Sequence, residues 1–308
     1  MDLFKDKKAE PMLLNESKPF DSQDYIYELK LDGIRCLAYI DKKSVTLRNK
    51  RNKDVTSLYP ELCDMNLCVS KKCILDGELV ILKNGKPNFF ELQKRSLMTD
   101  NFKIQLSAKS NPVFFVAYDI LYIGQKQITH LPLMERKKTL TNNLKEGHQL
   151  MISRYIEEKG KSFFKKVKKE NLEGIVAKKK DGKYYMGKRC DEWIKIKVLQ
   201  EEDLWIIGYE LNEQNQIKNL VFGQQNNNKN QWIYRGKVAI GIPDSLKQII
   251  LKTSKKHLNT TSIFPQYQNI IWLKPYLQGK VSYMQLTKNQ TMRQPVFKEL
   301  VDDFPLKK

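Results

Sequence analysis

One short segment near the start of the chain constrains it more than any other feature. Segment 30–35 reads KLDGIR: Lys30 comes just before an Asp-Gly pair and Arg35 follows it. Strand-like residues flank the segment at 25–29 and 36–40. Two strands joined by Asp-Gly are typical of a β-hairpin. The pattern predicts a tight turn that holds the Lys30 amine at a strand end, where an amine beside other cations can become a nucleophile. Taken alone, it is equally typical of a solvated surface hairpin.

The charge of the chain indicates a polyanionic partner. Fifty-five Lys and Arg against thirty-five Asp and Glu give a formal net charge of +20 over 308 residues. Neutralisation of phosphates and release of their counterions drive nucleic-acid binding. A lysine-rich solubilising surface gives the same surplus, so charge alone does not decide between the two.

Composition also excludes several classes of protein. Hydrophobic residues make up 41% of the chain, which is typical of a globular protein, and the length suits two domains. No apolar run approaches the ~20 residues that span a bilayer, and a signal-peptide core is missing. We expect a cytoplasmic protein with no membrane contact. Five cysteines without a C-x-x-C pair and three scattered histidines disfavour a zinc site or a Ser-His-Asp or Cys-His hydrolase.

Strand and helix patterns divide the chain near residue 200. A polar lead-in at 1–24 precedes a mixed α and β region, and an acidic break at 200–203 separates this region from a second run of strands. Short strands with one helix favour a small barrel such as an OB fold in the second region. Strands are predicted at 25–31, 34–40, 44–48, 74–82, 113–122, 174–178, 193–198, 204–211, 217–223, 231–239 and 269–273, and helices at 134–145, 160–170 and 243–257.

Two carboxylates follow Lys30 at predicted strand ends. Segment 75–79 reads LDGEL and places Glu78 after a second Asp-Gly turn. Segment 172–178 reads LEGIVAK and places Glu173 at the start of a strand. Either carboxylate alone is typical of a solvated turn. Beside a nucleophilic lysine, the two together are suited to bind a metal ion or a ribose.

An aromatic residue and a pair of cations complete the set. Tyr118 lies in a buried-looking strand at 114–121. Lys195 and Lys197 alternate in the strand 193–197, so both side chains point to one face. Each alone is typical of a core residue or an exposed strand face. Together with the lysine, the arginine and the two carboxylates, they provide the set of groups that nucleotidyl transfer needs.

The order of these motifs resembles that of ATP-dependent DNA ligases in the covalent lysine-nucleotidyltransferase superfamily. The likeness is to the short bacterial ligases, including the ligase modules of end joining, and it extends from residue 11 to residue 297. Any one motif is weak, and their common order makes the resemblance specific. The matching segments are 30–35 (KLDGIR), 47–49 with 54–56 and 59–62, 76–79 (DGEL), 118–121 (YDIL), 131–136, 173–176 (EGIV) and 193–197 (WIKIK).

The resemblance implies a fold and a reaction. The fold is α+β: a nucleotidyltransferase domain at 1–199, ATP-grasp-like with antiparallel sheets and flanking helices, and a C-terminal OB-fold β-barrel at 200–308. Lys30 would attack the α-phosphate of ATP, release pyrophosphate and become Lys–AMP. AMP would then pass to the 5′-phosphate of a nick or break in duplex DNA, and the 3′-hydroxyl would displace it. ATP and Mg²⁺ (or Mn²⁺) are the implied cofactors.

The resemblance also implies roles for individual residues. Lys30 is the catalytic nucleophile. Arg48 is the arginine expected to contact ATP, and Arg51 is the alternative because segment 48–51 can be aligned with the family motif in two ways. Asp32 is a further candidate metal contact and Arg293 a candidate DNA contact. In the nucleotide site, Glu28 lies near adenine, Tyr118 stacks on it, Arg35 and Arg48 bind phosphate or ribose, Glu78 contacts ribose or metal, Glu173 binds metal, and Lys195 and Lys197 bind the α-phosphate.

The last family motif is altered in this chain. The family ends with Arg-x-Asp-Lys, which closes over pyrophosphate during self-adenylation, whereas segment 301–304 reads VDDF. Arg293, Lys307 or Lys308 are possible substitutes. Loss of transition-state cations would slow the first step. Two classes stay open: an active ligase, and a ligase-like DNA-end-binding module that adenylates poorly.

Other enzymes share parts of the pattern. An RNA ligase or a capping guanylyltransferase would also carry the Lys30 motif, but segment 286–297 resembles DNA ligases. An NAD-dependent ligase is disfavoured because its zinc-binding cysteines are missing. By analogy with end joining, a Ku-like end-binding protein and a primase are expected partners. We expect a monomer associated with the bacterial nucleoid, with a hinge near 199–203.

Overall fold

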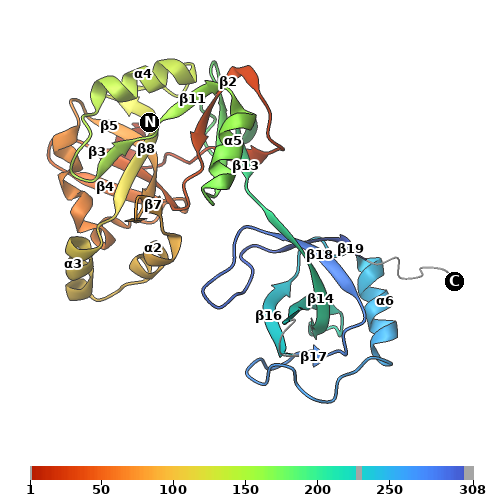
Figure 1. Ribbon diagram of the computed structural model, residues 1–308. Coiled ribbons are helices and arrows are strands. Elements are labelled where there is room, and N and C mark those ends of the chain that lie inside the picture. Colours follow the sequence, from red (N-terminus) through yellow and green to blue (C-terminus); the bar gives the residue numbers. More distant parts are fainter. Residues whose placement is uncertain (1, 227–230, 302–308) are drawn as a thin grey trace. The chain divides into compact units, whose positions relative to one another are not determined.

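The computed structural model describes residues 2–226 and 231–301. These residues form two compact units, of which unit 1 ends at Val198 and unit 2 begins at Leu199. Figure 1 shows that each unit has its own sheet or sheets and its own helices. In the described part of the chain, every helix is too short or too polar to cross a membrane.

Two β-sheets form the frame of unit 1. Neighbouring strands are antiparallel except at one pair in each sheet, where they are parallel. Sheet A has the order β1 (Leu13–Glu16), β13 (Arg189–Lys197), β12 (Gly174–Lys179), β2 (Ser22–Leu29) and β11 (Tyr155–Glu158). Sheet B has the order β10 (Leu150–Ile152), β8 (Phe114–Ile123), β5 (Cys73–Val80), β3 (Ile34–Ile40) and β4 (Val45–Asn49), with β9 (Lys126–Gln127) beside β8.

Helices cover the outer faces of these sheets. Helix α5 (Gly160–Lys169) packs Val167 and its neighbours against the apolar face of sheet A, and α4 (Leu133–Asn143) packs along β8 of sheet B. Both helices agree with the amphipathic pattern of the sequence to within two residues. The remaining elements are α1 (Leu3–Asp6), α2 (Phe89–Ser96), α3 (Asn101–Ser110), 3₁₀ turns at Thr56–Leu58 and Pro60–Cys68, and a small ribbon of β6 (Leu82–Lys83) and β7 (Lys86–Pro87).

The inner faces of the two sheets meet through aromatic side chains. Trp193 of β13 is buried. The centre of its ring lies 5.8 Å from the ring centre of Tyr118 of β8 and 5.6 Å from that of Tyr184, and both pairs are edge-on. Because strand residues alternate between faces, the other inward positions of both sheets line the same interface. The Arg35 guanidinium of β3 also lies between the two sheets, 5.5 Å from the centre of the Trp193 ring.

The hairpin predicted at Asp32-Gly33 is wrong. Strand β2 pairs with β11 and β12 in sheet A, whereas β3 pairs with β4 and β5 in sheet B. The Asp-Gly segment carries the chain from one sheet to the other. Its glycine is needed for close approach, since a Cβ on Gly33 would lie 2.3 Å from the carbonyl oxygen of Leu79.

The second predicted Asp-Gly turn is also wrong. Asp76 and Gly77 lie inside the continuous strand β5, at an irregularity in its pairing with β8. A Cβ on Gly77 would lie 2.5 Å from the ring of Phe115, so this glycine marks a close approach within a sheet. Glu78 is consequently a strand residue that faces the interior of unit 1.

Two other expectations are corrected. The segment 1–24 is not a surface lead-in over its described part, because Leu3, Phe4 and Met12 are buried and β1 joins sheet A. The ring of Phe4, for example, packs near the rings of Tyr39 and Tyr122, which lie in strands far from it in the sequence. The acidic stretch 200–203 does not interrupt the strands, because it lies inside the strand Gln200–Leu211, although the boundary between the two units falls just before it.

Unit 2 is a small barrel. Five strands run in the order β16 (Gln231–Val238), β15 (Ile217–Asn226), β14 (Gln200–Leu211), β18 (Gln278–Tyr283) and β19 (Val296–Leu300), with β17 (Ile271–Trp272) beside β14. The acidic start of β14 is exposed to solvent and pairs with β18, which is why the charges do not end the strand. The two edges approach where Ile240 bridges Val296. Helix α6 (Asp244–Ser254) supplies Leu246 and Ile250 to the barrel core.

Candidate active site

Lys30 lies where β2 ends and the chain crosses between the sheets. Its backbone N–H donates to the carbonyl of Gly174 at 2.9 Å, and its amine forms an ion pair with the carboxylate of Glu173. Gly174 has a φ of +149°, and a Cβ there would lie 2.2 Å from the carbonyl oxygen of Ile196. The glycine after Glu173 thus lets β12 begin close to β13, and this brings the carboxylate to the lysine.

Glu78 is the second carboxylate near this lysine. It is half-buried and pairs in register with Arg35 across β5 and β3. Burial raises the pKa of Glu78 to about 8; the positive charges of Lys30 and Arg35 oppose this rise, while Glu173 and Asp76 add to it. The predicted nucleophile and both predicted metal-binding carboxylates therefore lie within electrostatic reach of one another.

Arg35 is held by protein groups. Its Nε and one Nη donate to the buried carboxylate of Asp76 at 3.0 and 2.6 Å, and its other Nη donates to the carbonyl of Met12 at 2.5 Å. The hydroxyl of Tyr184 also donates to Asp76, at 2.7 Å. This network ties β3, β5 and the segment before β1 together. The predicted contact of Arg35 with phosphate or ribose stays a prediction.

Arg48 and Arg51, the two candidate arginines, lie in different surroundings, and which of them contacts ATP stays a prediction. Arg48 lies in β4 opposite Leu37, which in turn lies opposite Asp76, so Arg48 and Asp76 share one face of sheet B. It is half-buried and donates to the carbonyl of Asn52 at 2.9 Å. Arg51 is exposed in the turn after β4.

The aromatic surface at Tyr118 has a cation above it. The amine of Lys178 lies 4.3 Å from the centre of the Tyr118 ring and 3.9 Å from that of Trp193. The Arg35 guanidinium lies 5.8 Å from the Tyr118 ring centre. Both cations lie over the Tyr118 ring, which satisfies its negative face. The predicted stacking of Tyr118 on adenine stays a prediction.

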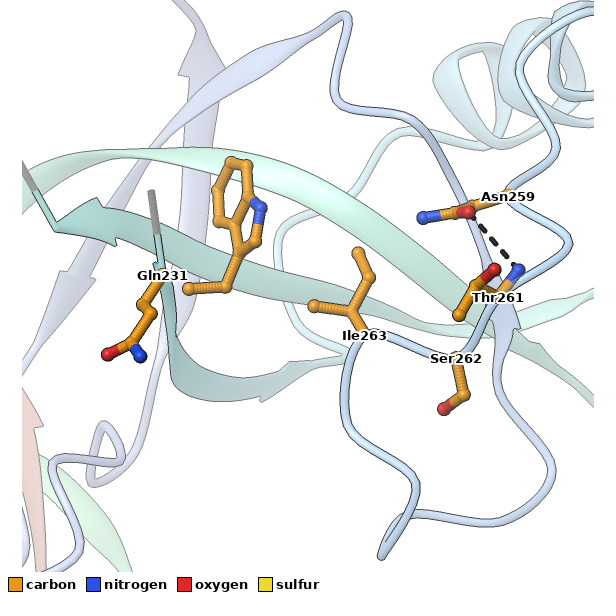
Figure 2. Close-up of a pocket in the computed structure, with 6 residues that line it drawn as sticks. Gln231, Asn259, Thr261, Ser262 and Ile263 are labelled. Atoms are coloured by element: carbon orange, nitrogen blue, oxygen red, sulfur yellow. Dashed lines mark hydrogen bonds between the residues drawn. The ribbon is translucent and has the colours of Figure 1, made fainter. Parts of the chain in front are cut away.

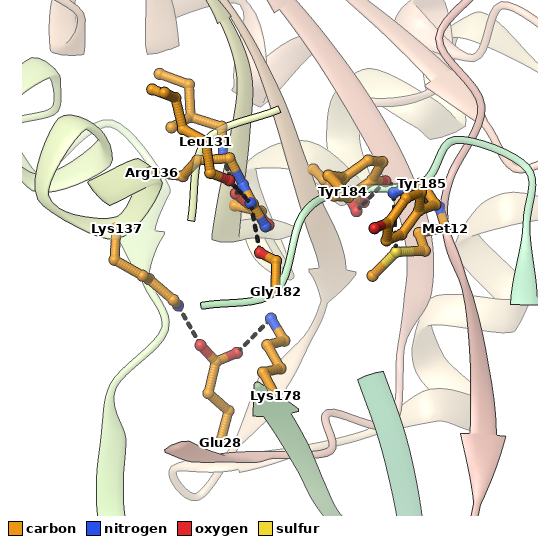
Figure 3. Close-up of polar contacts among 12 residues, drawn as sticks. Met12, Glu28, Leu131, Arg136, Lys137, Lys178, Gly182, Tyr184 and Tyr185 are labelled. Atoms are coloured by element: carbon orange, nitrogen blue, oxygen red, sulfur yellow. Dashed lines mark hydrogen bonds and ion pairs between the residues drawn. The ribbon is translucent and has the colours of Figure 1, made fainter. Parts of the chain in front are cut away.

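Glu28 is the centre of a buried charge cluster, shown in Figure 3. Only 2% of its surface is exposed. One carboxylate oxygen pairs with Lys137 of α4 and the other lies 2.8 Å from the amine of Lys178. Burial lowers the pKa of Lys178 to about 8; Glu28 opposes this shift and Lys137 adds to it. The sequence did not single out either lysine, although Lys178 belongs to the EGIVAK segment.

Asp119 and Arg136 form a second buried pair, and Figure 3 shows the contacts of the arginine. The guanidinium donates to both oxygens of Asp119 at 2.9 and 2.8 Å, and also to the carbonyls of Leu131 and Gly182 at 2.6 and 3.0 Å. All the donors named here have partners, as a buried charge requires. The pair fixes α4 on β8 behind the site.

Lys195 and Lys197 point to one face of sheet A, as the alternation predicts. Their amines lie 3.3 and 3.2 Å from the same carboxylate oxygen of Glu16, on the neighbouring strand β1. Partial burial raises the pKa of Glu16, but hydrogen bonds and charge from Lys197 and then Lys195 outweigh it, so the net pKa is lowered. The sequence did not identify Glu16, which fell within the supposed lead-in.

The metal prediction rests on two carboxylates. Among the residues that the structure describes, no three His, Cys, Asp or Glu side chains gather in one place. Magnesium commonly binds through one or two carboxylates, water and substrate phosphates, so Glu78 and Glu173 fit such an ion when phosphates are present. Their metal role stays a prediction.

Arg293 belongs to unit 2. It is half-buried after β18, where its N–H donates to the carbonyl of Gln285 at 2.9 Å and its own carbonyl accepts from Met284 at 3.0 Å. Its role toward DNA stays a prediction. The altered motif at Asp302, Asp303 and Phe304, together with Lys307 and Lys308, lies outside the described residues.

Unit 2 also has a pocket of about 440 Å³, shown in Figure 2. The described side chains that line it are all uncharged. One of them, Trp232, packs in an aromatic cluster with Tyr234 and Phe264. Thr261 and Ser262 supply hydroxyls, but the described lining holds no acid or base that could activate them. Its lining residues are Gln231, Trp232, Asn259, Thr261, Ser262 and Ile263.

The sequence of this chain matches known protein families and individual known proteins. A family model for the ATP dependent DNA ligase domain matches residues 10–197, and one for the ATP dependent DNA ligase C terminal region matches residues 213–304. The SPbeta prophage-derived DNA ligase-like protein LigB of Bacillus subtilis is 33% identical over 201 residues, which cover 65% of this chain and 71% of LigB. The multifunctional non-homologous end joining protein LigD of Mycolicibacterium smegmatis is 28% identical over 306 residues, which cover 95% of this chain and 38% of LigD.

Solved structures agree with these matches. A mycobacterial DNA ligase D complexed with ATP and MES has a TM-score of 0.56 and 25% identity, covering 96% of this chain and 95% of that one. A Lig E DNA ligase has a TM-score of 0.65 at 16% identity, covering 94% and 98%, and shows the fold alone. The predicted α+β nucleotidyltransferase domain followed by an OB-fold barrel is confirmed. The chain belongs to the family of ATP-dependent DNA ligases.

Proposed function

We propose that this chain seals 5′-phosphate/3′-hydroxyl nicks or breaks in duplex DNA through a Lys30–AMP intermediate. The observation that carries the proposal is the contact between Lys30 and Glu173, with Glu78 beside them and two lysines on the adjoining sheet face. A lysine that only binds DNA does not require two carboxylates beside its amine. The chain spans little more than a third of the LigD relatives that it matches, so a role shared with those whole proteins is a proposal by analogy.

In the first step, the Lys30 amine attacks the α-phosphorus of ATP. A P–N bond forms, the P–O bond to pyrophosphate breaks, and pyrophosphate leaves with that electron pair. The proton that the amine must lose can pass to Glu173, the carboxylate it already contacts. A Mg²⁺ or Mn²⁺ ion held by Glu173 and Glu78 would offset the negative charge of the phosphates.

Other side chains position the nucleotide. Lys195 and Lys197 would bind the α-phosphate oxygens, where fixed positive charge stabilises the transition state. Tyr118 would stack on adenine, next to the buried carboxylate of Glu28. Arg35 and Arg48 would contact phosphate or ribose, and Arg35 would first have to share its bonds to Asp76.

The second and third steps require DNA. AMP would move from Lys30 to the 5′-phosphate, and the 3′-hydroxyl would attack that phosphate and expel AMP. The net charge of +20 favours salt-sensitive DNA binding, with Arg293 as one contact. By analogy with its LigD relatives, we propose a role in end joining as a nucleoid-associated monomer, with a Ku-like protein and a primase as partners.

A second candidate follows from the altered motif at 301–304. Without the family's arginine and lysine, the chain would bind DNA ends and adenylate itself poorly. Self-adenylation separates the two candidates. The protein is mixed with α-phosphate-labelled ATP and Mg²⁺ or Mn²⁺, and then chased with nicked DNA.

We expect label on Lys30 that passes to DNA and ends in a sealed strand. Lys30→Ala is the control, and nicked RNA offered beside nicked DNA tests for an RNA ligase. No label, with sealing of pre-adenylated nicks, would favour the second candidate. Failure of both reactions would overturn the proposed ligase activity.

A further inference from the structure

The two predicted phosphate-binding lysines share one carboxylate. Lys195 and Lys197 both reach the same oxygen of Glu16, at 3.3 and 3.2 Å. Register places Glu16 directly beside Lys195 across β1 and β13, so its side chain leaves the sheet on the lysine face. An anionic oxygen of Glu16 thus lies between the two lysine amines that are predicted to bind phosphate.

The chemistry of this contact matches that of a phosphate oxygen. A carboxylate oxygen and a phosphate oxygen are both anionic acceptors for lysine ammonium groups. Each ammonium has three N–H donors, so one lysine can contact two anions at once. Two anions that shared both lysines would, however, lie close enough to repel each other. Binding of the α-phosphate therefore favours movement of Glu16 away from the lysines.

The exposure of the pair makes such an exchange feasible. The side chain of Glu16 is 47% exposed, against 26% for Lys195 and 21% for Lys197. A half-exposed ion pair loses little free energy when its members separate into water. By contrast, a buried carboxylate such as Glu28 could not leave its lysines without a large desolvation penalty.

We infer that Glu16 is an anion that competes with the α-phosphate for Lys195 and Lys197 and thereby sets the affinity for ATP and AMP. The inference rests on the proposed function, because that function assigns Lys195 and Lys197 to the phosphate. When a nucleotide enters, Glu16 turns out toward water. When AMP leaves after sealing, Glu16 returns to the lysines and opposes rebinding.

The test is nucleotide binding by Glu16→Gln, which keeps the size of the side chain and removes its charge. Binding is measured by equilibrium dialysis in a Lys30→Met background, where no covalent step takes place. We expect the Kd for ATP and for AMP to fall about three- to tenfold, the range for loss of two half-exposed pairs. The Kd for adenosine, which has no phosphate, should not change.

Glu157→Gln is the matched control. Glu157 is 49% exposed and pairs with Lys180 at 2.5 Å, also in sheet A but outside the site. Its replacement should leave the Kd for AMP and for ATP unchanged. An unchanged or weaker affinity of Glu16→Gln for AMP would overturn the inference, since Glu16 would then only position the lysines. An equal gain for adenosine would also overturn it.

The same variant separates this inference from the proposed ligase function. Self-adenylation and nick sealing are followed in the Lys30 protein, with and without Glu16→Gln. No Lys30–AMP and no sealing in either would overturn the ligase proposal, while the dialysis result would still decide the role of Glu16. Normal self-adenylation with an unchanged half-saturating ATP concentration would overturn the role of Glu16 alone.

Discussion

The ion pairs of unit 1 fall into two groups that differ in exposure. Asp119 and Arg136 are both completely buried, whereas Glu16 and its lysines are all partly exposed. Breaking a buried pair leaves an uncompensated charge and costs about 3–5 kcal/mol. An exposed pair contributes only about 0–1 kcal/mol. The buried pairs therefore fix the geometry of the site, and the exposed pairs can exchange a protein partner for a ligand.

The same division runs through the remaining charged residues. Asp76 and Glu28 are buried, and their ion pairs connect neighbouring elements of unit 1. The side chain of Lys30 is 22% exposed and that of its partner Glu173 is 9% exposed. The proposed nucleophile is thus more exposed than the carboxylate with which it pairs.

The largest effect is expected at the exposed lysine that reacts. Lys30→Ala removes the amine proposed to form the P–N bond, so AMP transfer should fall below detection. Its effect on DNA binding should be small, because one charge among fifty-five Lys and Arg is lost. Adenylation and gel-shift assays measure the two properties. Normal sealing by this variant would refute the lysine mechanism.

The next effect concerns the buried framework. Arg136→Met leaves Asp119 charged and unpaired, so the free energy of unfolding should fall by about 3–5 kcal/mol. Urea denaturation followed by tryptophan fluorescence measures it.

Arg154→Met is the matched control, because Arg154 is exposed and pairs only with the partly exposed Glu146 at the surface. Its change should stay within about 0.5 kcal/mol. An equal loss in the free energy of unfolding for Arg136→Met and Arg154→Met would show that buried and exposed ion pairs do not differ in this protein.

The third effect concerns the aromatic surface. Tyr118→Ala should raise the half-saturating ATP concentration for self-adenylation about 5- to 100-fold, since stacking of a base on an aromatic ring contributes about 1–3 kcal/mol. Sealing of pre-adenylated nicks should suffer less. Tyr118→Phe keeps the ring and should behave like the parent. Equal losses in both reactions would indicate a structural role.

The smallest effect is a pH dependence. The pKa of Lys178 is about 8 in the folded protein, against an ordinary value of 10.5. Between these values the unfolded chain binds more protons, so the free energy of unfolding should rise with pH in that window.

Lys178→Met should lose this rise, with thermal unfolding at pH 8 to 10 as the measurement. Lys179→Met is the control, because Asp181 raises the pKa of Lys179. A rise of the same size in Lys178→Met would show that Lys178 does not carry it.

Local patterns in the sequence were sufficient for many elements. Strand-like runs identified β3, β5 and β12, alternation identified β13, and helical spacing of apolar residues identified α5 and α6. These patterns depend on neighbours within one strand or helix. They do not determine which strands share a sheet, and this is why the chain on either side of Asp32-Gly33 was assigned to one hairpin.

The site was predicted in part for the same reason. Lys30, Glu78 and Glu173 were identified because their types and order are unusual, and the structure brings them together. Lys137 and Lys178 were missed, because a lysine is normally exposed and only tertiary packing buries these two around Glu28. Glu16 was missed because its neighbour β13 follows more than 170 residues later.

That late pairing has a consequence for synthesis on the ribosome. Strand β1 emerges long before β13 and must wait for that strand before it has its partner in sheet A. Until then the nascent chain holds Lys30 but neither of the lysines that would receive the α-phosphate. Chains that terminate early would thus be unable to consume ATP, and the reactive site is completed only as unit 1 is completed.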